Sequence, residues 1–141
     1  MFRLFIVDDN KYERNGIKNS INWRELDVEV VGVFANAYDA IGKVDELKPD
    51  IIITDISMPG MNAIEMSERI LKYHPEIKII FISCHSDFEY AKSAISLGVH
   101  GYVLKPVLSD ELIREVNNVI DELNLQELQK KIGRASCRER V

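Results

Sequence analysis

Short apolar runs, each bounded by turn residues, recur along the chain and predict the strands of a sheet. The runs are apolar at nearly every position rather than at alternate ones, which is typical of strands that are covered on both faces. Five segments have this pattern: Phe2–Val7, Val28–Ala35, Ile51–Thr54, Ile77–Ser83 and Gly101–Leu104.

The segments between these runs carry apolar residues at helical spacing, so each would present one apolar stripe. They are Tyr12–Ile21, Ala37–Leu47, Ala63–Tyr73, Phe88–Leu97 and Asp110–Leu128. Trp23, between the first helix and the second strand, is expected to close that connection from within the core. The alternation of single strands with single helices predicts right-handed crossovers, and therefore an α/β fold with a doubly wound parallel sheet of the (βα)₅ type.

Length and composition fit one globular domain. The chain has 141 residues, of which 46% are hydrophobic and 29% charged, which excludes a largely disordered chain. No apolar stretch approaches the roughly 20 residues of a membrane helix. The acidic Asp8 and Asp9 come too early for a signal peptide, so we expect a cytoplasmic protein that does not bind the membrane. Two cysteines make no disulfide framework. A net charge of −5 argues against nucleic-acid binding by this segment itself.

Residues 132–141 differ in composition from the rest of the chain. The segment reads IGRASCRERV and combines three arginines and one acidic residue with no apolar period. It resembles the translation of a common sequencing-adapter oligonucleotide, so we interpret it as a non-native tail and exclude it from the fold. A natural basic tail is the alternative. Under the first interpretation the gene was cut short and a further domain is missing.

Polar residues follow four of the predicted strands at the point where each strand ends. The first strand is followed by Asp8 and Asp9, the third by Asp55, the fourth ends in Ser83, and the fifth is followed by Lys105. In an open parallel sheet the carboxyl ends of the strands meet at one edge, where ligands bind. The sequence therefore predicts that three carboxylates, a hydroxyl and an amine converge there.

This set of groups favours one kind of chemistry. Crowded carboxylates repel one another and need a cation, and oxygen ligands without nearby soft donors favour magnesium, Mg²⁺. A carboxylate shielded by Mg²⁺ and Lys105 can act as a nucleophile toward phosphorus and form an acyl phosphate, while the hydroxyl of Ser83 binds a phosphoryl oxygen. Each residue alone has an ordinary explanation: Asp8 and Asp9 could cap the next helix, and a lysine before proline is usually solvated.

The same residues lie in longer motifs. These are Ile6-Val7-Asp8-Asp9, Pro49-Asp50-Ile51-Ile52-Ile53-Thr54-Asp55-Ile56-Ser57-Met58-Pro59-Gly60-Met61, Ile82-Ser83 and Gly101-Tyr102-Val103-Leu104-Lys105-Pro106. From Phe2 to about Leu123 the chain closely resembles the receiver domain of two-component response regulators, which implies the flavodoxin-like strand order 2-1-3-4-5. Ile21-Asn22-Trp23, Phe88-Glu89-Tyr90-Ala91 and Leu104-Lys105-Pro106-Val107 resemble the branch that precedes an AraC-type helix-turn-helix output domain.

The resemblance implies a role for each site residue. Asp55 would be the phosphorylation site, accepting phosphate from a phosphohistidine on a sensor histidine kinase. Asp9, Asp55 and the backbone carbonyl of Ser57 would bind Mg²⁺ directly, with Asp8 acting mainly through a metal-bound water. Lys105 would pair with the phosphoryl group.

A second group of residues would transmit the signal. Ser83 would swing toward the phosphoryl group, and Tyr102 would turn inward behind it. The face formed by the fourth helix and fifth strand would then change and dimerise the protein. The peptide bond between Lys105 and Pro106 is cis in the family, a geometry nearly confined to proline.

The resemblance also divides the chain. Residues 1–123 would be the receiver (phosphoacceptor) domain, 124–131 an extension of the last helix into a linker, and 132–141 the non-native tail. The linker helix would either pair in a dimer or form only a frayed end. The domain would be a phosphorelay switch rather than an ordinary enzyme, although it could catalyse its own phosphorylation and dephosphorylation. It would regulate transcription, reaching DNA only through a missing C-terminal output domain.

The chain departs from the family pattern at two places. Asn62-Ala63 stands where Asp-Gly is common, and because alanine lacks the freedom of glycine at positive φ, we expect a different or strained loop there. Cys84 and His85 follow the switch hydroxyl in place of a small residue and an aromatic one. His85 could tune hydrolysis of the phosphoryl group or be a solvated loop residue.

Three other functions are compatible with this topology. A flavin-binding flavodoxin-like protein would need a loop rich in glycine and hydroxyls after the first strand, where the chain has Asp8-Asp9-Asn10-Lys11. A phosphatase with an aspartyl nucleophile would place a second acid two residues after Asp55, where Ser57 stands. A module that binds proteins without being phosphorylated is the third.

Overall fold

A computed structural model describes residues 1–84 and 99–139 of the chain. The predicted helix Phe88–Leu97 and the residue His85 lie outside the described residues. Within the described ranges, no helix is long and apolar enough to cross a membrane.

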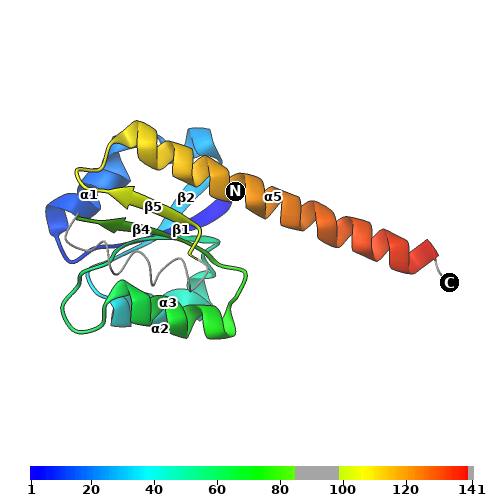
Figure 1. The fold of residues 1–141 in the computed structure, drawn as a ribbon, viewed down its shortest axis with the longest axis horizontal. Coiled ribbons are helices and arrows are strands. Elements are labelled where there is room, and N and C mark those ends of the chain that lie inside the picture. Colours follow the sequence, from blue (N-terminus) through cyan, green and yellow to red (C-terminus); the bar gives the residue numbers. More distant parts are fainter. Residues whose placement is uncertain (85–98, 140–141) are drawn as a thin grey trace.

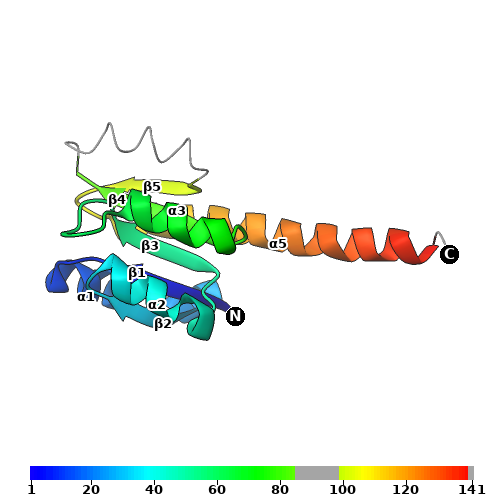
Figure 2. The same ribbon diagram turned by 90° about the horizontal axis from the view of Figure 1, so that it is seen from below.

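Five parallel strands form one sheet, shown in Figures 1 and 2. The strands are β1 (Phe2–Val7), β2 (Val28–Phe34), β3 (Ile51–Asp55), β4 (Lys78–Ser83) and β5 (Gly101–Leu104). Their order across the sheet is β2-β1-β3-β4-β5, and all neighbours are parallel. This confirms the strand order, and each strand begins and ends within one or two residues of its predicted apolar run.

Helices cover both faces of the sheet (Figure 1). The described α-helices are α1 (Lys11–Ser20), α2 (Ala37–Leu47), α3 (Ala63–Tyr73) and α5 (Ser109–Glu139), and a short 3₁₀ helix, η1 (Trp23–Leu26), follows α1. Helices α1 and α5 pack on one face, and α2 and α3 on the other. The structure therefore has the doubly wound arrangement that the alternation of strands and helices predicts.

The core is divided by the sheet into two apolar clusters. Along β3, Ile52 belongs to the cluster beneath α2 and α3, whereas Ile51 and Ile53 belong to the one beneath α1 and α5. All three side chains are fully buried, each contributing about 1.5–3 kcal/mol by leaving water. Trp23 is buried in the second cluster, as its position between α1 and β2 predicts. The central strands are packed on both faces, which fixes the positions of the residues that follow them.

Helix α5 extends well beyond the sheet (Figure 2). Its first part packs on the core through Leu112, Val116 and Val119, whereas Leu125 and Leu128 are exposed. The helix continues to Glu139, past the predicted end at Leu128. The added stretch begins with Gln129, Lys130 and Lys131, which are good helix formers, so the helix can continue here without packing on the core.

Candidate functional site

The topology brings the carboxyl ends of four strands to one edge of the sheet. Asp8 directly follows β1, Asp55 ends β3, Ser83 ends β4 and Lys105 directly follows β5. The edge coincides with the point where the strand order reverses, because the first strand lies between the second and the third. Open α/β sheets bind ligands at this point.

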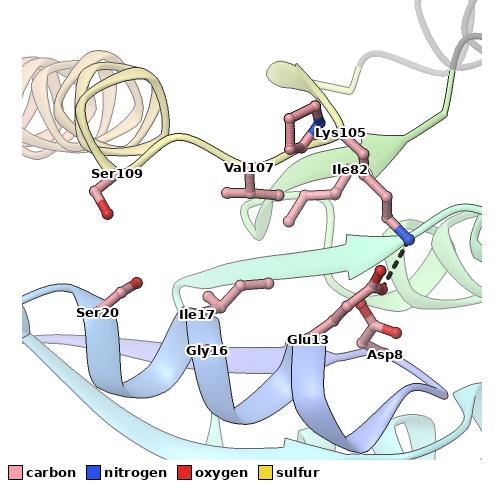
Figure 3. Close-up of a pocket in the computed structure, with 10 residues that line it drawn as sticks. Asp8, Glu13, Gly16, Ile17, Ser20, Ile82, Lys105, Val107 and Ser109 are labelled. Atoms are coloured by element: carbon pink, nitrogen blue, oxygen red, sulfur yellow. Dashed lines mark hydrogen bonds and ion pairs between the residues drawn. The ribbon is translucent and has the colours of Figure 1, made fainter.

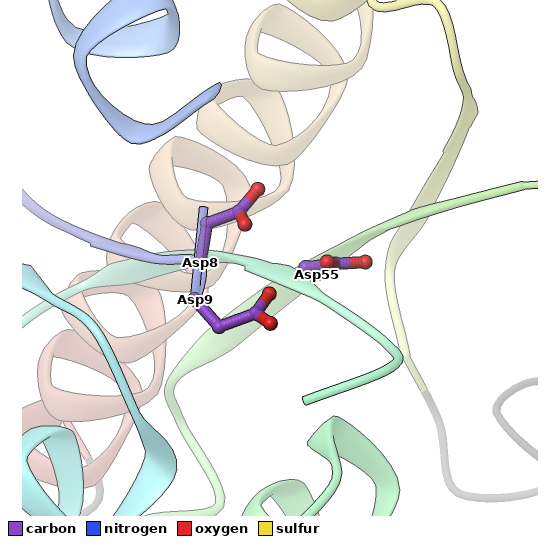
Figure 4. A group of neighbouring side chains, drawn as sticks. All are labelled: Asp8, Asp9 and Asp55. Atoms are coloured by element: carbon purple, nitrogen blue, oxygen red, sulfur yellow. The ribbon is translucent and has the colours of Figure 1, made fainter. Parts of the chain in front are cut away.

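Three carboxylates lie together at this edge, as Figure 4 shows. Asp8, Asp9 and Asp55 each offer an oxygen, and these oxygens lie within 4.8 Å of one another. Asp8 and Asp55 are buried, with 1% and 5% of their surface exposed, while Asp9 is exposed. The three residues could therefore hold a small cation between buried and solvated oxygens.

Asp8 is only partly satisfied by the protein. Its Oδ1 accepts a hydrogen bond from the backbone N–H of Asn10 at 2.9 Å. Its Oδ2 is buried and has no hydrogen-bond partner in the part of the chain that the structure describes. Helix α1 is capped by the side chain of Asn10, which accepts from the N–H groups of Tyr12 and Glu13. The ordinary explanation of Asp8 and Asp9 as caps of α1 is therefore wrong.

Crowding and burial shift the acid–base behaviour of the carboxylates. Burial raises the pKa of Asp8 to about 7; the hydrogen bond from Asn10 opposes this, and the nearby Glu13 and Asp55 add to it. Burial also raises the pKa of Asp55, although the positive charge of Lys105 partly offsets the effect. A buried acid without a counterion is disfavoured in its charged form, so a divalent cation here would relieve a real cost.

Lys105 supplies the positive charge at the edge. Its Nζ lies 3.3 Å from Oδ2 of Asp55. It also lies 2.8 Å from Oε2 of Glu13, a contact drawn as a dashed line in Figure 3. Burial lowers the pKa of the ammonium, but the hydrogen bond to Glu13 and the charges of Asp55, Glu13 and Asp8 outweigh it and raise the pKa above its ordinary value. The peptide bond between Lys105 and Pro106 is cis, and the N–H of Lys105 donates to the carbonyl of Ser83 at 2.8 Å. Lys105 is thus charged and held beside Asp55.

Glu13 is a site residue that the sequence analysis missed. It lies in the first turn of α1 and its carboxylate reaches Lys105, which stands 92 positions away in the sequence. One signal could have found it: side chains on a helix lean toward the helix N-terminus, and the N-terminus of α1 follows Asp8 and Asp9 directly.

Ser83 and Tyr102 are already in contact. The hydroxyl of Ser83 is hydrogen-bonded to the hydroxyl of Tyr102 and donates to the carbonyl of Cys84 at 3.2 Å. Tyr102 is half-buried on β5, in register with Phe81 of β4. The two hydroxyls therefore form a direct link from the edge of the sheet to β5.

The loop between β3 and α3 is not strained at Ala63, contrary to our expectation. Asn62 is the N-cap of α3, and Ala63 is its first residue, fully buried, with its N–H donating to the carbonyl of Ile56 at 3.1 Å. The positive φ of this loop falls at Gly60, with a φ of 82°. Alanine is tolerated because the backbone at position 63 is helical. Ser57 lies in the same loop and is exposed.

A cavity of about 350 Å³ opens beside Lys105, between α1 and the segment that joins β5 to α5. Figure 3 shows its lining, with Glu13 and Lys105 at one end and the apolar Ile17 and Val107 farther along. Among the described residues, Asp8, Glu13 and Lys105 belong both to the cavity lining and to the charged group at the edge of the sheet.

Known proteins share this arrangement. Residues 4–117 match the sequence profile of the response regulator receiver domain. The chain is 33% identical to the transcriptional regulatory protein YesN of Bacillus subtilis over 131 residues, covering 93% of this chain and 36% of YesN. It is 35% identical to the chemotaxis protein CheY of Listeria monocytogenes over 113 residues, covering 80% of this chain and 93% of CheY.

The fold is also similar to solved structures. A two-component transcriptional regulator AraC from Clostridium phytofermentans superposes with a TM-score of 0.84 at 33% identity, covering 90% of this chain and 98% of the other. The chain spans only 36% to 54% of the length of the curated transcriptional regulators it matches, whereas it covers nearly all of the single-domain CheY.

Proposed function

This chain belongs to the response regulator receiver domain family, and from that premise we propose that Asp55 accepts a phosphoryl group from the phosphohistidine of a sensor histidine kinase. Receiver domains are the phosphoacceptors of two-component signalling. The observation that carries the assignment to Asp55 is its position: its carboxylate lies 3.3 Å from the Lys105 ammonium and shares the edge of the sheet with Asp8 and Asp9.

The residues at the edge fit a magnesium ion. We propose that Asp9, Asp55 and the backbone carbonyl of Ser57 hold Mg²⁺, with Asp8 contributing through water. The donor set is all oxygen, and the buried, unpartnered Oδ2 of Asp8 is an acceptor that the described residues leave unsatisfied. When bound, the ion supplies positive charge that offsets the repulsion between the carboxylates and an incoming phosphoryl group.

The transfer itself uses the side chains of Asp55, Lys105 and Ser83. An oxygen of the Asp55 carboxylate attacks phosphorus and forms an acyl phosphate. The P–N bond to the kinase histidine breaks, its electron pair stays on the imidazole nitrogen, and that nitrogen takes up a proton from solvent. Lys105 binds one phosphoryl oxygen and the hydroxyl of Ser83 another, so that both neutralise charge at fixed positions. The same groups would let the domain catalyse its own phosphorylation by small donors.

Phosphorylation would then change the surface around β5. The new group brings nearly two negative charges and attracts the hydroxyl of Ser83. Because Ser83 and Tyr102 are hydrogen-bonded, movement of one requires the other to adjust. We propose that this adjustment shifts the population toward a form that dimerises.

The longer protein would regulate transcription. The curated transcriptional regulators extend well beyond the region this chain matches, and one structural relative bears the name AraC. We propose that residues 1–123 are the receiver domain and 124–131 a linker helix, and that an AraC-type DNA-binding output domain follows in the natural protein. We propose that residues 132–141 are a non-native tail. Both the kinase domain that donates phosphate and the DNA would be met in the cytoplasm.

Phosphorylation by a small donor tests the proposal directly. The protein is incubated with Mg²⁺ and acetyl phosphate, and its intact mass is measured. We expect one added phosphate on the unmodified sequence and none on Asp55→Asn. The exposed Asp121 of α5 gives a matched control, because Asp121→Asn removes the same charge far from the edge.

Three results would contradict the proposal. Full labelling of Asp55→Asn would mean that phosphate attaches elsewhere. No labelling of the unmodified sequence would favour a module that binds partners without phosphorylation. Continuous turnover of a phosphomonoester would instead indicate a phosphatase.

A further inference from the structure

Lys105 is held between two carboxylates that approach it from different elements. Glu13 of α1 lies at 2.8 Å (dashed line in Figure 3) and Asp55 of β3 at 3.3 Å. The shorter contact is therefore to the residue that is not the proposed phosphoacceptor. The side chain of Lys105 is 19% exposed and that of Glu13 is 40% exposed. The pair therefore lies at the boundary between the buried edge of the sheet and solvent. Because it is only partly exposed, water does not fully screen its charges from the neighbouring groups.

Both members of this pair are ionised. Burial raises the pKa of Glu13, but the hydrogen bond and the positive charge of Lys105 outweigh it and hold the pKa below its ordinary value. Glu13 thus adds a negative charge beside Asp9 and Asp55, and it engages the same ammonium that a phosphoryl group on Asp55 would need.

Resting on the proposed function, we propose that Glu13 is a positioning residue that holds Lys105 as its own counterion and thereby slows phosphoryl acceptance at Asp55. Two effects act in the same direction. An incoming phosphoryl group must compete with Glu13 for the Lys105 ammonium, and its own negative charge is repelled by the Glu13 carboxylate. Glu13 would therefore set how readily this receiver responds to a weak phosphodonor.

The test compares labelling rates of three variants with that of the unmodified chain. Glu13→Gln keeps the size and an acceptor oxygen but removes the charge, whereas Glu13→Asp keeps the charge. Glu46→Gln is the matched control, because Glu46 forms an exposed ion pair with Lys43 at 3.0 Å near the end of α2. Initial rates are measured by intact mass at limiting acetyl phosphate with Mg²⁺, and thermal melting confirms that each variant is folded.

We expect Glu13→Gln to be labelled about two- to fivefold faster, the range that a partly exposed ion pair can contribute. Glu13→Asp and Glu46→Gln should stay close to the unmodified rate. The gain should shrink as NaCl is raised, because salt screens a charge effect but not a change in packing. As a readout without turnover, beryllium fluoride, a phosphoryl mimic, should bind Glu13→Gln more tightly by a similar factor in calorimetry.

Equal or slower labelling of Glu13→Gln, with Asp55 still the labelled residue, would overturn the role of Glu13 and leave the proposed function intact. A gain that is independent of salt would also overturn it. If no protein is labelled, the proposed function fails and the role of Glu13 fails with it.

Discussion

In the folded protein without a bound cation, the Asp8 carboxyl group favours its protonated form. It is fully buried, its Oδ2 has no partner among the described residues, and its pKa is raised from 3.8 to about 7. The folded protein therefore keeps a proton on Asp8 up to about pH 7, whereas the unfolded chain loses it near pH 3.8. Since the folded state binds more protons in this window, its stability falls as pH rises through it.

Asp8→Asn should remove this dependence. In metal-free buffer at pH 8 we expect the variant to be more stable than the unmodified chain by about 1–3 kcal/mol, because a buried charge without a counterion is gone. The difference should vanish near pH 4, where Asp8 is protonated in the folded state. Urea unfolding at the two pH values measures both. Equal stability at pH 8, or a variant that is less stable there, would contradict this account of Asp8.

Magnesium should offset the loss of stability that ionisation of Asp8 causes. Binding at the edge favours the charged carboxylates, so added Mg²⁺ should stabilise the unmodified chain more at pH 8 than at pH 5. Asp8→Asn should gain less from Mg²⁺ than the unmodified chain at pH 8. This pair of melting curves tests the metal site without phosphorylation.

At the residue scale, the sequence predicts which residues form the site better than it predicts their contacts and their pKa values. Asp8, Asp55 and Lys105 could be predicted because each stands where an apolar run ends, and parallel strands bring those ends together. Glu13 was missed because its role depends on a contact across 92 positions, and an acidic residue in a first helical turn is common for other reasons, so the lean of its side chain toward the site is a weak signal. The raised pKa of Asp8 depends on burial, which no spacing reveals.

At the element scale, asparagine begins three of the four described α-helices. Asn10, Asn36 and Asn62 are the N-caps of α1, α2 and α3, and each accepts hydrogen bonds from the first turn of its helix. The caps of α1 and α3 lie at the edge of the sheet that carries Asp9 and Asp55. They therefore fix the helix ends that border the site.

Asn62→Ala should lower the free energy of unfolding by about 1 kcal/mol, because the N–H of Glu65 loses its acceptor. Asn62→Asp keeps the acceptor and should stay near the stability of the unmodified chain. Urea unfolding followed by circular dichroism measures both. A fully stable Asn62→Ala would show that this cap contributes nothing to α3.

The sequence predicts the elements well because two independent patterns agree. The strands are apolar on both faces and the helices on one, and the two periods are easily distinguished. The expectation of strain at Ala63 was wrong because the sequence does not show which position of the loop has positive φ. In the structure that position is Gly60, two residues before the N-cap Asn62. The C-terminal end of α5 was predicted too early because the residues after Leu128 show no apolar period from which a helix could be predicted.

At the scale of the whole molecule, the projecting part of α5 presents a narrow apolar seam. Leu125 and Leu128 are 54% and 52% exposed and lie three residues apart, one of the two spacings that alternate in coiled coils. If the change proposed around β5 takes place, we expect this seam to add to a dimer interface in the phosphorylated protein.

Sedimentation with and without phosphodonor tests this expectation. The unmodified chain should sediment near its monomer mass of 16.2 kDa without donor and move toward twice that mass with Mg²⁺ and acetyl phosphate. Asp55→Asn should remain monomeric under both conditions, and Leu128→Gln should dimerise less. A mass that does not respond to the donor would contradict phosphorylation-dependent dimerisation.

The most direct measurement of the central claim is the chemical location of the phosphate. Borohydride reduces an aspartyl phosphate to homoserine, so reduction after labelling, followed by peptide sequencing in a mass spectrometer, marks the acceptor residue. We predict homoserine at position 55 alone, formed with Mg²⁺ and absent when the metal is chelated. Homoserine at Asp8 or Asp9, or labelling at position 55 that is indifferent to chelation, would contradict the account.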